Sequence, residues 1–234
     1  MFDSAALRAR LTDVRDRIAR AASRVGRDAA SVRLIAVSKT FSSDHVRAAA
    51  DAGQIDFGEN KVQEGLQKIE HTEDLPLRWH LIGHLQSNKA RLAARFDTIH
   101  SIDAAALLTK VDAAASAAGR RVEVLIQIDL AKEPTKHGVA PEDVRPILTV
   151  APSCRAARLR GLMLLPPAFD DPEQARPYFV ALRQLRDGLV QQTGEPALLA
   201  ELSMGMSHDF EVAVEEGATM VRVGSAIFGG RPYA

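Results

Sequence analysis

Eight short runs rich in β-branched and other apolar residues alternate with helix-like segments along this chain of 234 residues. The predicted strands are residues 32–38, 55–57, 79–83, 98–101, 122–128, 159–163, 198–202 and 220–223. The predicted helices between them lie near residues 44–53, 61–70, 86–95, 104–118, 141–151, 172–192 and 208–217. Strands that alternate with helices pair in parallel and are joined by right-handed crossovers. The pattern therefore predicts an α/β fold.

Two architectures accommodate eight such strands, a closed (β/α)8 barrel and an open doubly wound sheet. An open sheet that binds a dinucleotide carries a G-x-G-x-x-G turn after its first strand. Here the first strand is followed by Ser38-Lys39-Thr40-Phe41, which contains no glycine. Eight strands are also the number that closure requires. Because the composition does not shift and no Pro/Gly/Ser-rich linker interrupts the chain, we predict a single (β/α)8 TIM barrel over residues 1–234.

An additional helix is predicted before the first strand, over residues 3–26. Its apolar residues recur at helical spacing and form one stripe: Leu7, Leu11, Val14, Ile18 and Val25. Seven arginines between Arg8 and Arg27 also fit a membrane-binding or transit segment, but acidic residues interrupt that face. We predict that residues 1–27 pack on the barrel, where the helix could cover the lower mouth.

Composition excludes several classes of function. The 30 Lys and Arg residues balance 30 Asp and Glu residues, which argues against nucleic-acid binding and against a basic membrane surface. No run approaches the roughly 18 apolar residues of a membrane span, and the first residues do not resemble a signal peptide. A single cysteine indicates a reducing compartment. We expect a cytoplasmic protein.

In a (β/α)8 barrel the functional residues lie where strands end and the following loops begin. The residues at those positions are Lys39, Glu59-Asn60, Gly83-His84, Ser101 to Asp103, Asp129, Met163, Ser203 to Ser207, and Gly224-Ser225.

Lys39 closes the first predicted strand. Alternation along the strand places Ile35, Val37 and Lys39 on the face toward the barrel interior. Apolar surroundings favour a neutral amine, which suits Schiff-base formation. A lysine that extends to solvent from a strand end is the alternative.

Small residues follow the last two strands. Met206 and Ser207 lie in one loop, and Gly224 and Ser225 in the next, each before a predicted helix. Barrels often bind phosphate there, through backbone N–H groups and helix N-termini, although tight turns also contain such residues. Arg222 is predicted to point into the barrel, toward a pyridine nitrogen, a carboxylate or an internal ion partner. An imine-forming lysine, a phosphate cradle and a ring-nitrogen partner together indicate pyridoxal 5′-phosphate (PLP).

Five motifs carry a resemblance to a known family. They are LIAVSKT at 34–40, FGENKVQE at 57–64, WHLIGHLQSNK at 79–89, GLMLL at 161–165, and LSMGMSHDFEVAVEEGATMVRVGSAIFGGR at 202–231. The sequence resembles the YggS/PROSC family of PLP-binding proteins, also called PLP homeostasis proteins, over nearly its whole length.

The resemblance implies a barrel like the N-terminal domain of alanine racemase, and a cofactor carrier and regulator of vitamin B6 supply without an established catalytic activity. It implies a Schiff base on Lys39, and Arg222 at the pyridine nitrogen. The other implied cofactor residues are Asn60, Met206, Ser207, Gly224 and Ser225. We expect a monomer whose partners include PLP and PLP-dependent apoenzymes, with neither nucleic acid nor a membrane among them.

An amino-acid racemase or a decarboxylase-like enzyme is the alternative function, and a barrel that binds another phosphorylated ligand is a third. A two-base racemase needs a proton carrier opposite the lysine, usually a tyrosine from another domain. The only tyrosines here are Tyr178 and Tyr233, and neither lies at a predicted strand end. An arginine at the ring nitrogen also weakens the ring as an electron sink. We therefore assign no catalytic residue.

His80 and His84 have the i, i+4 spacing of zinc-binding helices, but they flank a predicted strand. That spacing on a strand separates them by about 13 Å, too far for one metal ion. We predict no metal site. His80 is expected to lie against the cofactor ring or to pack within the barrel. Lys136 to Gly138 is expected to form a lip over the site or an exposed turn.

Overall fold

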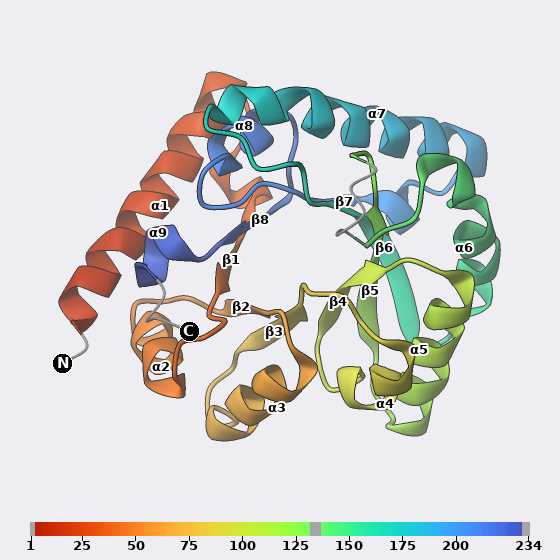
Figure 1. Ribbon diagram of the computed structural model, residues 1–234, viewed down its shortest axis with the longest axis horizontal. Coiled ribbons are helices and arrows are strands. Elements are labelled where there is room, and N and C mark those ends of the chain that lie inside the picture. Colours follow the sequence, from red (N-terminus) through yellow and green to blue (C-terminus); the bar gives the residue numbers. More distant parts are fainter. Residues whose placement is uncertain (1–2, 132–136, 231–234) are drawn as a thin grey trace.

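The computed structural model describes residues 3–131 and 137–230. Within them eight parallel strands form a closed barrel, in which each strand pairs with the next and the last pairs with the first (Figure 1). The strands are β1 (Arg33–Val37), β2 (Asp56–Glu59), β3 (Arg78–Leu81), β4 (Thr98–Ile102), β5 (Val122–Ile128), β6 (Ala157–Leu164), β7 (Glu201–Ser203) and β8 (Met220–Val223). The predicted barrel is confirmed.

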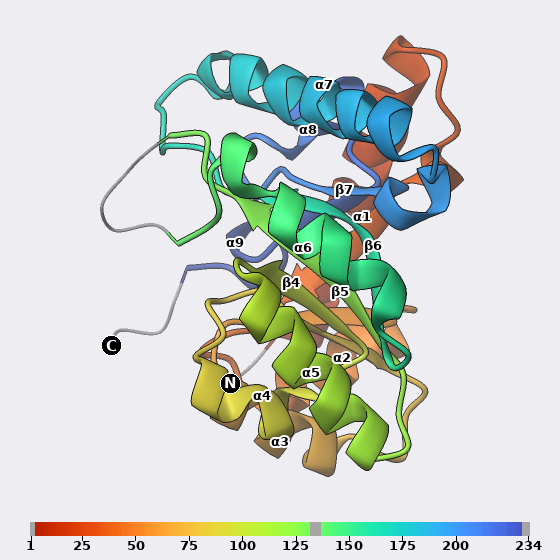
Figure 2. The same cartoon turned by 90° about the vertical axis from the view of Figure 1, so that its right-hand side faces the viewer.

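Helices surround this barrel (Figure 2). They are α1 (Ser4–Arg24), α2 (Ser43–Asp51), α3 (Val62–His71), α4 (Ala90–Ala93), α5 (Ala105–Ala117), α6 (Arg145–Val150), α7 (Arg176–Thr193), α8 (Phe210–Glu215) and α9 (Ser225–Phe228). Within residues 3–131 and 137–230, no helix is long and apolar enough to cross a membrane.

The strand boundaries agree with the prediction at β5 and β8 and differ most at β7. The prediction placed that strand at 198–202, but Pro196–Leu199 forms a 3-10 turn and the strand is Glu201–Ser203. Proline fixes φ near the helical value and supplies no N–H for a sheet, so the turn takes the residues that looked like strand.

The barrel has two apolar regions on opposite sides of its wall. Alternate residues of each strand face the surrounding helices, where Phe57, Phe179 and Phe210 are fully buried in the main core. A small separate cluster lies inside the barrel: Ile35, Leu125, Met163 and Met220. Ile35 therefore points inward, as the alternation along β1 predicts.

The position of α1 corrects one expectation. The helix does not cover the lower mouth but lies along the outside of the barrel, against α2, α8 and α9 (Figure 1). Because α9 is a single turn, α1 fills the place in the outer ring that a longer last helix would occupy. Four of its five predicted stripe residues are buried, but Val25 follows the last helical residue and is exposed.

The arginines of α1 and of the following turn hold the helix on the barrel. Arg15 donates to the carbonyls of Ala52 and Gly53, just after the end of α2. Arg27 donates to the carbonyls of Val214 and Ala218, at and after the end of α8. The last carbonyls of a helix lack an N–H four residues further on, so the arginines supply donors at these two helix ends. The basic face that suggested a membrane contact is largely an intramolecular one.

Two glycines give a stability test of the barrel wall. A Cβ on Gly161 would lie 1.9 Å from the carbonyl oxygen of Glu201 on the paired strand, whereas a Cβ on Gly188, within α7, meets no atom within 4 Å. Gly161→Ala should therefore destabilise the protein by about 2–3 kcal/mol. Gly188→Ala should stabilise it by about 1 kcal/mol, since alanine is the better helix former. Urea unfolding measures both, and equal effects would contradict the close approach of β6 and β7.

Candidate functional site

A cavity of about 580 Å³ lies at the carboxyl ends of the strands. It is lined by Val37, Lys39, Phe41, Asn60, Ile82, Gly83, His84, Gln127, His137, Leu165, Pro166, Ala168, Met206, Ser207, His208, Arg222, Gly224, Ser225 and Gly229. All seven residues predicted to bind the cofactor are among them. The structure thus brings together side chains from both ends of the sequence.

Lys39 sits in a turn whose backbone is strained. Thr40 has φ +70°, and no other non-glycine residue of the described chain has a positive φ. A β-branched residue is uncommon in this region and needs support from its surroundings. The Thr40 N–H donates to Oε1 of Glu64 at 2.6 Å. The first turn of α3 therefore holds the peptide that follows Lys39.

A buried ion pair supports the same turn from the other side. Nζ of Lys68 donates to the carbonyl of Ser38 at 2.7 Å, to Oε1 of Glu59 at 2.6 Å and to Oε1 of Glu64 at 3.0 Å. The Ser38 hydroxyl also donates to Oε1 of Glu59. Burial raises the pKa of Glu59 even though the Lys68 charge opposes the shift. Residues 38 and 40 are both fixed, and Lys39 lies between them.

The loops after β7 and β8 are joined through Ser207. Its Oγ accepts from the N–H of Gly224 at 3.0 Å and from the N–H of Ala226 at 3.4 Å. Asp209 fixes the first loop, because its Oδ1 accepts from the N–H of Met206 at 2.6 Å. The pKa of Asp209 is raised by burial. Backbone donors of both loops therefore gather at one end of the cavity.

Arg222 reaches the cavity from the barrel interior, as the sequence predicts. On β8 the side chains of Val221 and Val223 face outward and lie in the main core, so Arg222 between them faces the interior. The buried guanidinium donates through Nη2 to the carbonyl of Leu164 at 2.8 Å and through Nη1 to Oγ of Ser203. Burial lowers the pKa of Arg222 to about 10, so the group stays charged at neutral pH.

Several cavity residues were not among the predicted cofactor residues. Gly83 is required by packing, since a Cβ there would lie 2.2 Å from the carbonyl oxygen of Asn60. Gln127 faces inward next to Leu125 on the same face of β5, so alternation along that strand could have identified it. The rings of His84 and His137 stack with centroids 3.6 Å apart. Burial, and then the charge of His137, lower the pKa of His84.

Other expectations have different outcomes. His80 does not line the cavity but packs inside the barrel against Asp56 and His100. No group of metal-ligating residues occurs within residues 3–131 and 137–230. Tyr178 packs against Phe169, with ring centroids 5.9 Å apart, rather than lining the cavity. Lys136 and Tyr233 lie outside the described residues.

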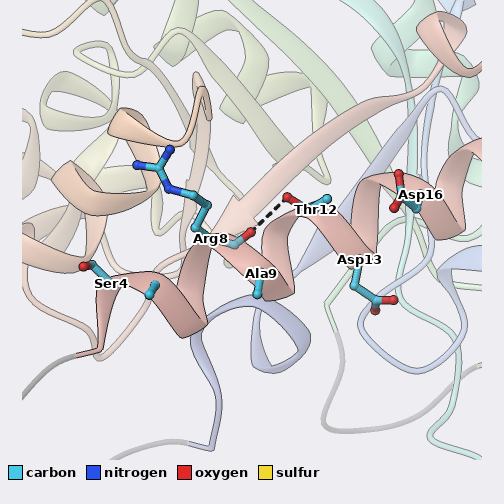
Figure 3. A pocket seen from close by; sticks show the side chains of 7 residues that line it. Ser4, Arg8, Ala9, Thr12, Asp13 and Asp16 are labelled. Carbon is cyan, nitrogen blue, oxygen red and sulfur yellow. Dashed lines mark hydrogen bonds between the residues drawn. The ribbon is translucent and has the colours of Figure 1, made fainter.

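A second hollow lies on the exposed side of α1 (Figure 3). Its lining comes from this helix alone: Ser4, Ala5, Arg8, Ala9, Thr12, Asp13 and Asp16. No other element of the described residues lines it, and the Thr12 hydroxyl donates to the Arg8 carbonyl of its own helix. It lacks the enclosure and convergent polar groups of a ligand site.

Comparison with known proteins agrees with this geometry. The model of the alanine racemase N-terminal domain family matches residues 10–232. The pyridoxal phosphate homeostasis protein of Aquifex aeolicus is 42% identical over 225 residues, which cover 96% of this chain and 98% of the relative. The chain belongs to the pyridoxal phosphate homeostasis protein family. The resemblance seen in the sequence is thereby confirmed.

Solved structures support the same assignment. PipY of Synechococcus elongatus PCC7942, whose structure was solved with PLP bound, is 40% identical in sequence to this chain. It matches with a TM-score of 0.84 over 95% of this chain and 100% of PipY. Alanine racemase of Clostridium difficile 630 is 15% identical, with a TM-score of 0.72 over 97% of this chain and 57% of the racemase. That likeness shows a common fold.

The buried pair behind Lys39 yields a prediction about stability and pH. Lys68→Met leaves the Glu59 carboxylate buried without its cation and should destabilise the protein by about 3 kcal/mol near pH 7. Burial then raises the pKa of Glu59 further in the folded state, so the folded protein binds more protons than the unfolded one. The stability of the variant therefore falls as pH rises through the raised pKa of Glu59. Its loss of unfolding free energy relative to wild type should be smaller near pH 5 than near pH 7.

Urea unfolding at both pH values measures the effect, and Lys110→Met is the matched control. Lys110 is exposed on α5, so its loss should change stability little at either pH. A Lys68→Met loss that did not diminish on acidification would mean that Glu59 is not the group left uncompensated.

Proposed function

We propose that this protein binds PLP in the cavity at the carboxyl ends of its strands and serves in intracellular PLP homeostasis. The observation that carries the proposal is the set of groups that share the cavity. The amine of Lys39, the guanidinium of Arg222, and the Ser207 hydroxyl with the N–H groups of Gly224 and Ala226 match an aldehyde, a ring nitrogen and a phosphate. Three chemically different ends of one ligand thus have separate partners.

The donor set fits PLP in charge as well as in kind. The Gly224 N–H points at Ser207, and without a side chain at residue 224 a phosphate can approach the backbone closely. Arg222 stays charged and can donate, so it suits the lone pair of an unprotonated pyridine nitrogen. PLP supplies an aldehyde for an imine with Nζ of Lys39. Asn60, Met206 and Ser225 would complete the contacts.

The relatives support the homeostasis role, because those that match over nearly the full chain are named pyridoxal phosphate homeostasis proteins, and PipY has been solved with PLP. We further propose a cytoplasmic monomer that exchanges PLP with PLP-dependent apoenzymes. The single cysteine and the balanced charge are consistent with such a protein. Among the described residues no tyrosine lines the cavity, which favours a carrier over a two-base racemase.

Borohydride reduction tests the attachment of the cofactor. We expect the purified protein with PLP to show an imine absorbance band, and reduction to add the cofactor mass to the peptide containing Lys39. Lys39→Ala should remove the band and keep the free energy of unfolding, measured in urea, within about 0.5 kcal/mol of wild type, since the side chain is only half-buried. Modification of another lysine would refute the assignment. Racemisation of amino acids that depends on Lys39 would favour the racemase.

The phosphate cradle has its own test. Ser207→Ala removes the hydroxyl that joins the two loops, and Gly224→Val places methyl groups against Val37. Each should weaken PLP binding by about tenfold and affect pyridoxal, which lacks the phosphate, much less. Fluorescence titration with both compounds measures the ratio. Equal losses for PLP and pyridoxal would show that these residues do not contact the phosphate.

A further inference from the structure

A chain of buried polar side chains crosses the barrel interior from one mouth to the other. Asp56 begins β2 at the mouth opposite the cavity, and its Oδ1 lies 3.0 Å from Nε2 of His80 on β3. Nδ1 of His80 lies 3.0 Å from Nε2 of His100 on β4. Nδ1 of His100 lies 2.9 Å from Oγ of Ser203 on β7, which accepts from Arg222. All five side chains are buried.

Counting protons gives this chain a single direction. An ionised Asp56 can only accept, so Nε2 of His80 must donate to it. If His80 is neutral, its Nδ1 accepts from Nε2 of His100. Nδ1 of His100 is then unprotonated and accepts a hydrogen bond from the Ser203 hydroxyl. Ser203 keeps its lone pairs for Arg222, and every donor and acceptor along the chain is satisfied.

The opposite direction is unfavourable. It would make His80 a buried cation and direct the His100 proton at Ser203, whose own hydroxyl proton would then have no acceptor among its contacts in the described chain. The pKa values agree with a neutral His100 and an ionised Asp56, from which the proton count starts. Burial is the largest cause that lowers the pKa of His100 well below its ordinary value. Burial would raise the pKa of Asp56, but hydrogen bonds from His80 and Arg78 outweigh it and lower the pKa.

We propose that Asp56, His80, His100 and Ser203 form a positioning relay for Arg222. Asp56 sets the proton position on both histidines, and these leave Ser203 as an acceptor that fixes the guanidinium in the cavity wall. The relay rests on the proposed function only in its purpose, which is to orient Arg222 toward the ring nitrogen of PLP. Its proton arrangement belongs to the protein itself and exists without the cofactor.

Arg78 makes the proposal testable from the far mouth. Its Nη2 donates to Oδ2 of Asp56 at 2.7 Å, and its side chain is half exposed. In Asp56→Asn the amide oxygen must face Arg78, because the guanidinium can only donate. The amide NH₂ group then faces Nε2 of His80, which must accept. Nδ1 of His80 donates to His100 in turn, and the proton on each histidine moves to Nδ1.

Removing Arg78 as well should reverse this change. In the double variant Asp56→Asn/Arg78→Ala, the amide is free to turn its oxygen to His80 and restore the original direction. A purely structural role predicts the contrary, since losing a second polar residue would only add damage. Arg78→Ala alone leaves the Asp56 carboxylate as acceptor and is the matched control.

Nitrogen-15 NMR of histidine-labelled protein without PLP reads the proton positions directly. We expect protonated Nε2 on His80 and His100 in wild type, protonated Nδ1 on both in Asp56→Asn, and the wild-type pattern in the double variant and in Arg78→Ala. A doubly protonated His80 in wild type would overturn the proposed direction, as would Asp56→Asn spectra with unchanged proton positions.

Titration with PLP then tests whether the relay reaches Arg222. Asp56→Asn should weaken PLP binding by about five- to tenfold, the size of one weakened hydrogen bond, and the double variant should recover most of it. In a Ser203→Ala background, which cuts the relay at Arg222, Asp56→Asn should have no further effect. Shifted proton positions with unchanged PLP affinity would overturn the positioning role. Failure of wild type to bind PLP would instead refute the proposed function and leave the NMR result standing.

Discussion

The pairing of β1 with β8 is the contact on which the cavity depends. It closes the barrel with Ile35 opposite Arg222 and Ala36 opposite Val223, although these residues are nearly 190 positions apart. The closure places Lys39, which follows β1, beside Gly224 and Ser225, which follow β8. Strand pairing of this range carries a large loop-closure cost before any contact is made. The site and the completed barrel therefore form together, and no smaller part of the sheet would hold the same groups.

The interior of this barrel is divided by chemistry. TIM barrels commonly fill the interior with layers of branched apolar side chains, and here Ile35, Leu125, Met163 and Met220 do so on one side. The remaining space contains ionised and neutral polar groups. Such a network is tolerated only when each member has its partners, because an unpaired polar group in a low dielectric is costly. Arg222 at the cavity needs hydrogen-bond partners, and the series of partnered polar groups continues from it through the barrel to Asp56.

Periodicity predicted most of the fold, because parallel strands that are buried on both faces appear in the sequence as short continuous apolar runs between helical segments. It also predicted the inward face of β1 and the position of Arg222. It could not predict that Pro196–Leu199 is a turn, or that α1 lies beside α9, since both depend on tertiary packing. The supports of Lys39 were missed for a similar reason. Glu64 and Lys68 look like an ordinary i, i+4 surface pair until β2 brings Glu59 beneath them.

Lys39 and Arg222 are held by networks of opposite character. The turn around Lys39 is strained at Thr40 and supported by full charges on Glu59, Glu64 and Lys68, so its geometry depends on protonation. Arg222 is held by neutral groups whose order is set by a carboxylate at the far mouth. In the proposed PLP complex, a guanidinium fixed in this way would leave the pyridine nitrogen unprotonated, and Lys39 in its supported turn would hold the aldehyde carbon in place. Both properties favour holding a cofactor over drawing electrons through its ring, as expected of a carrier.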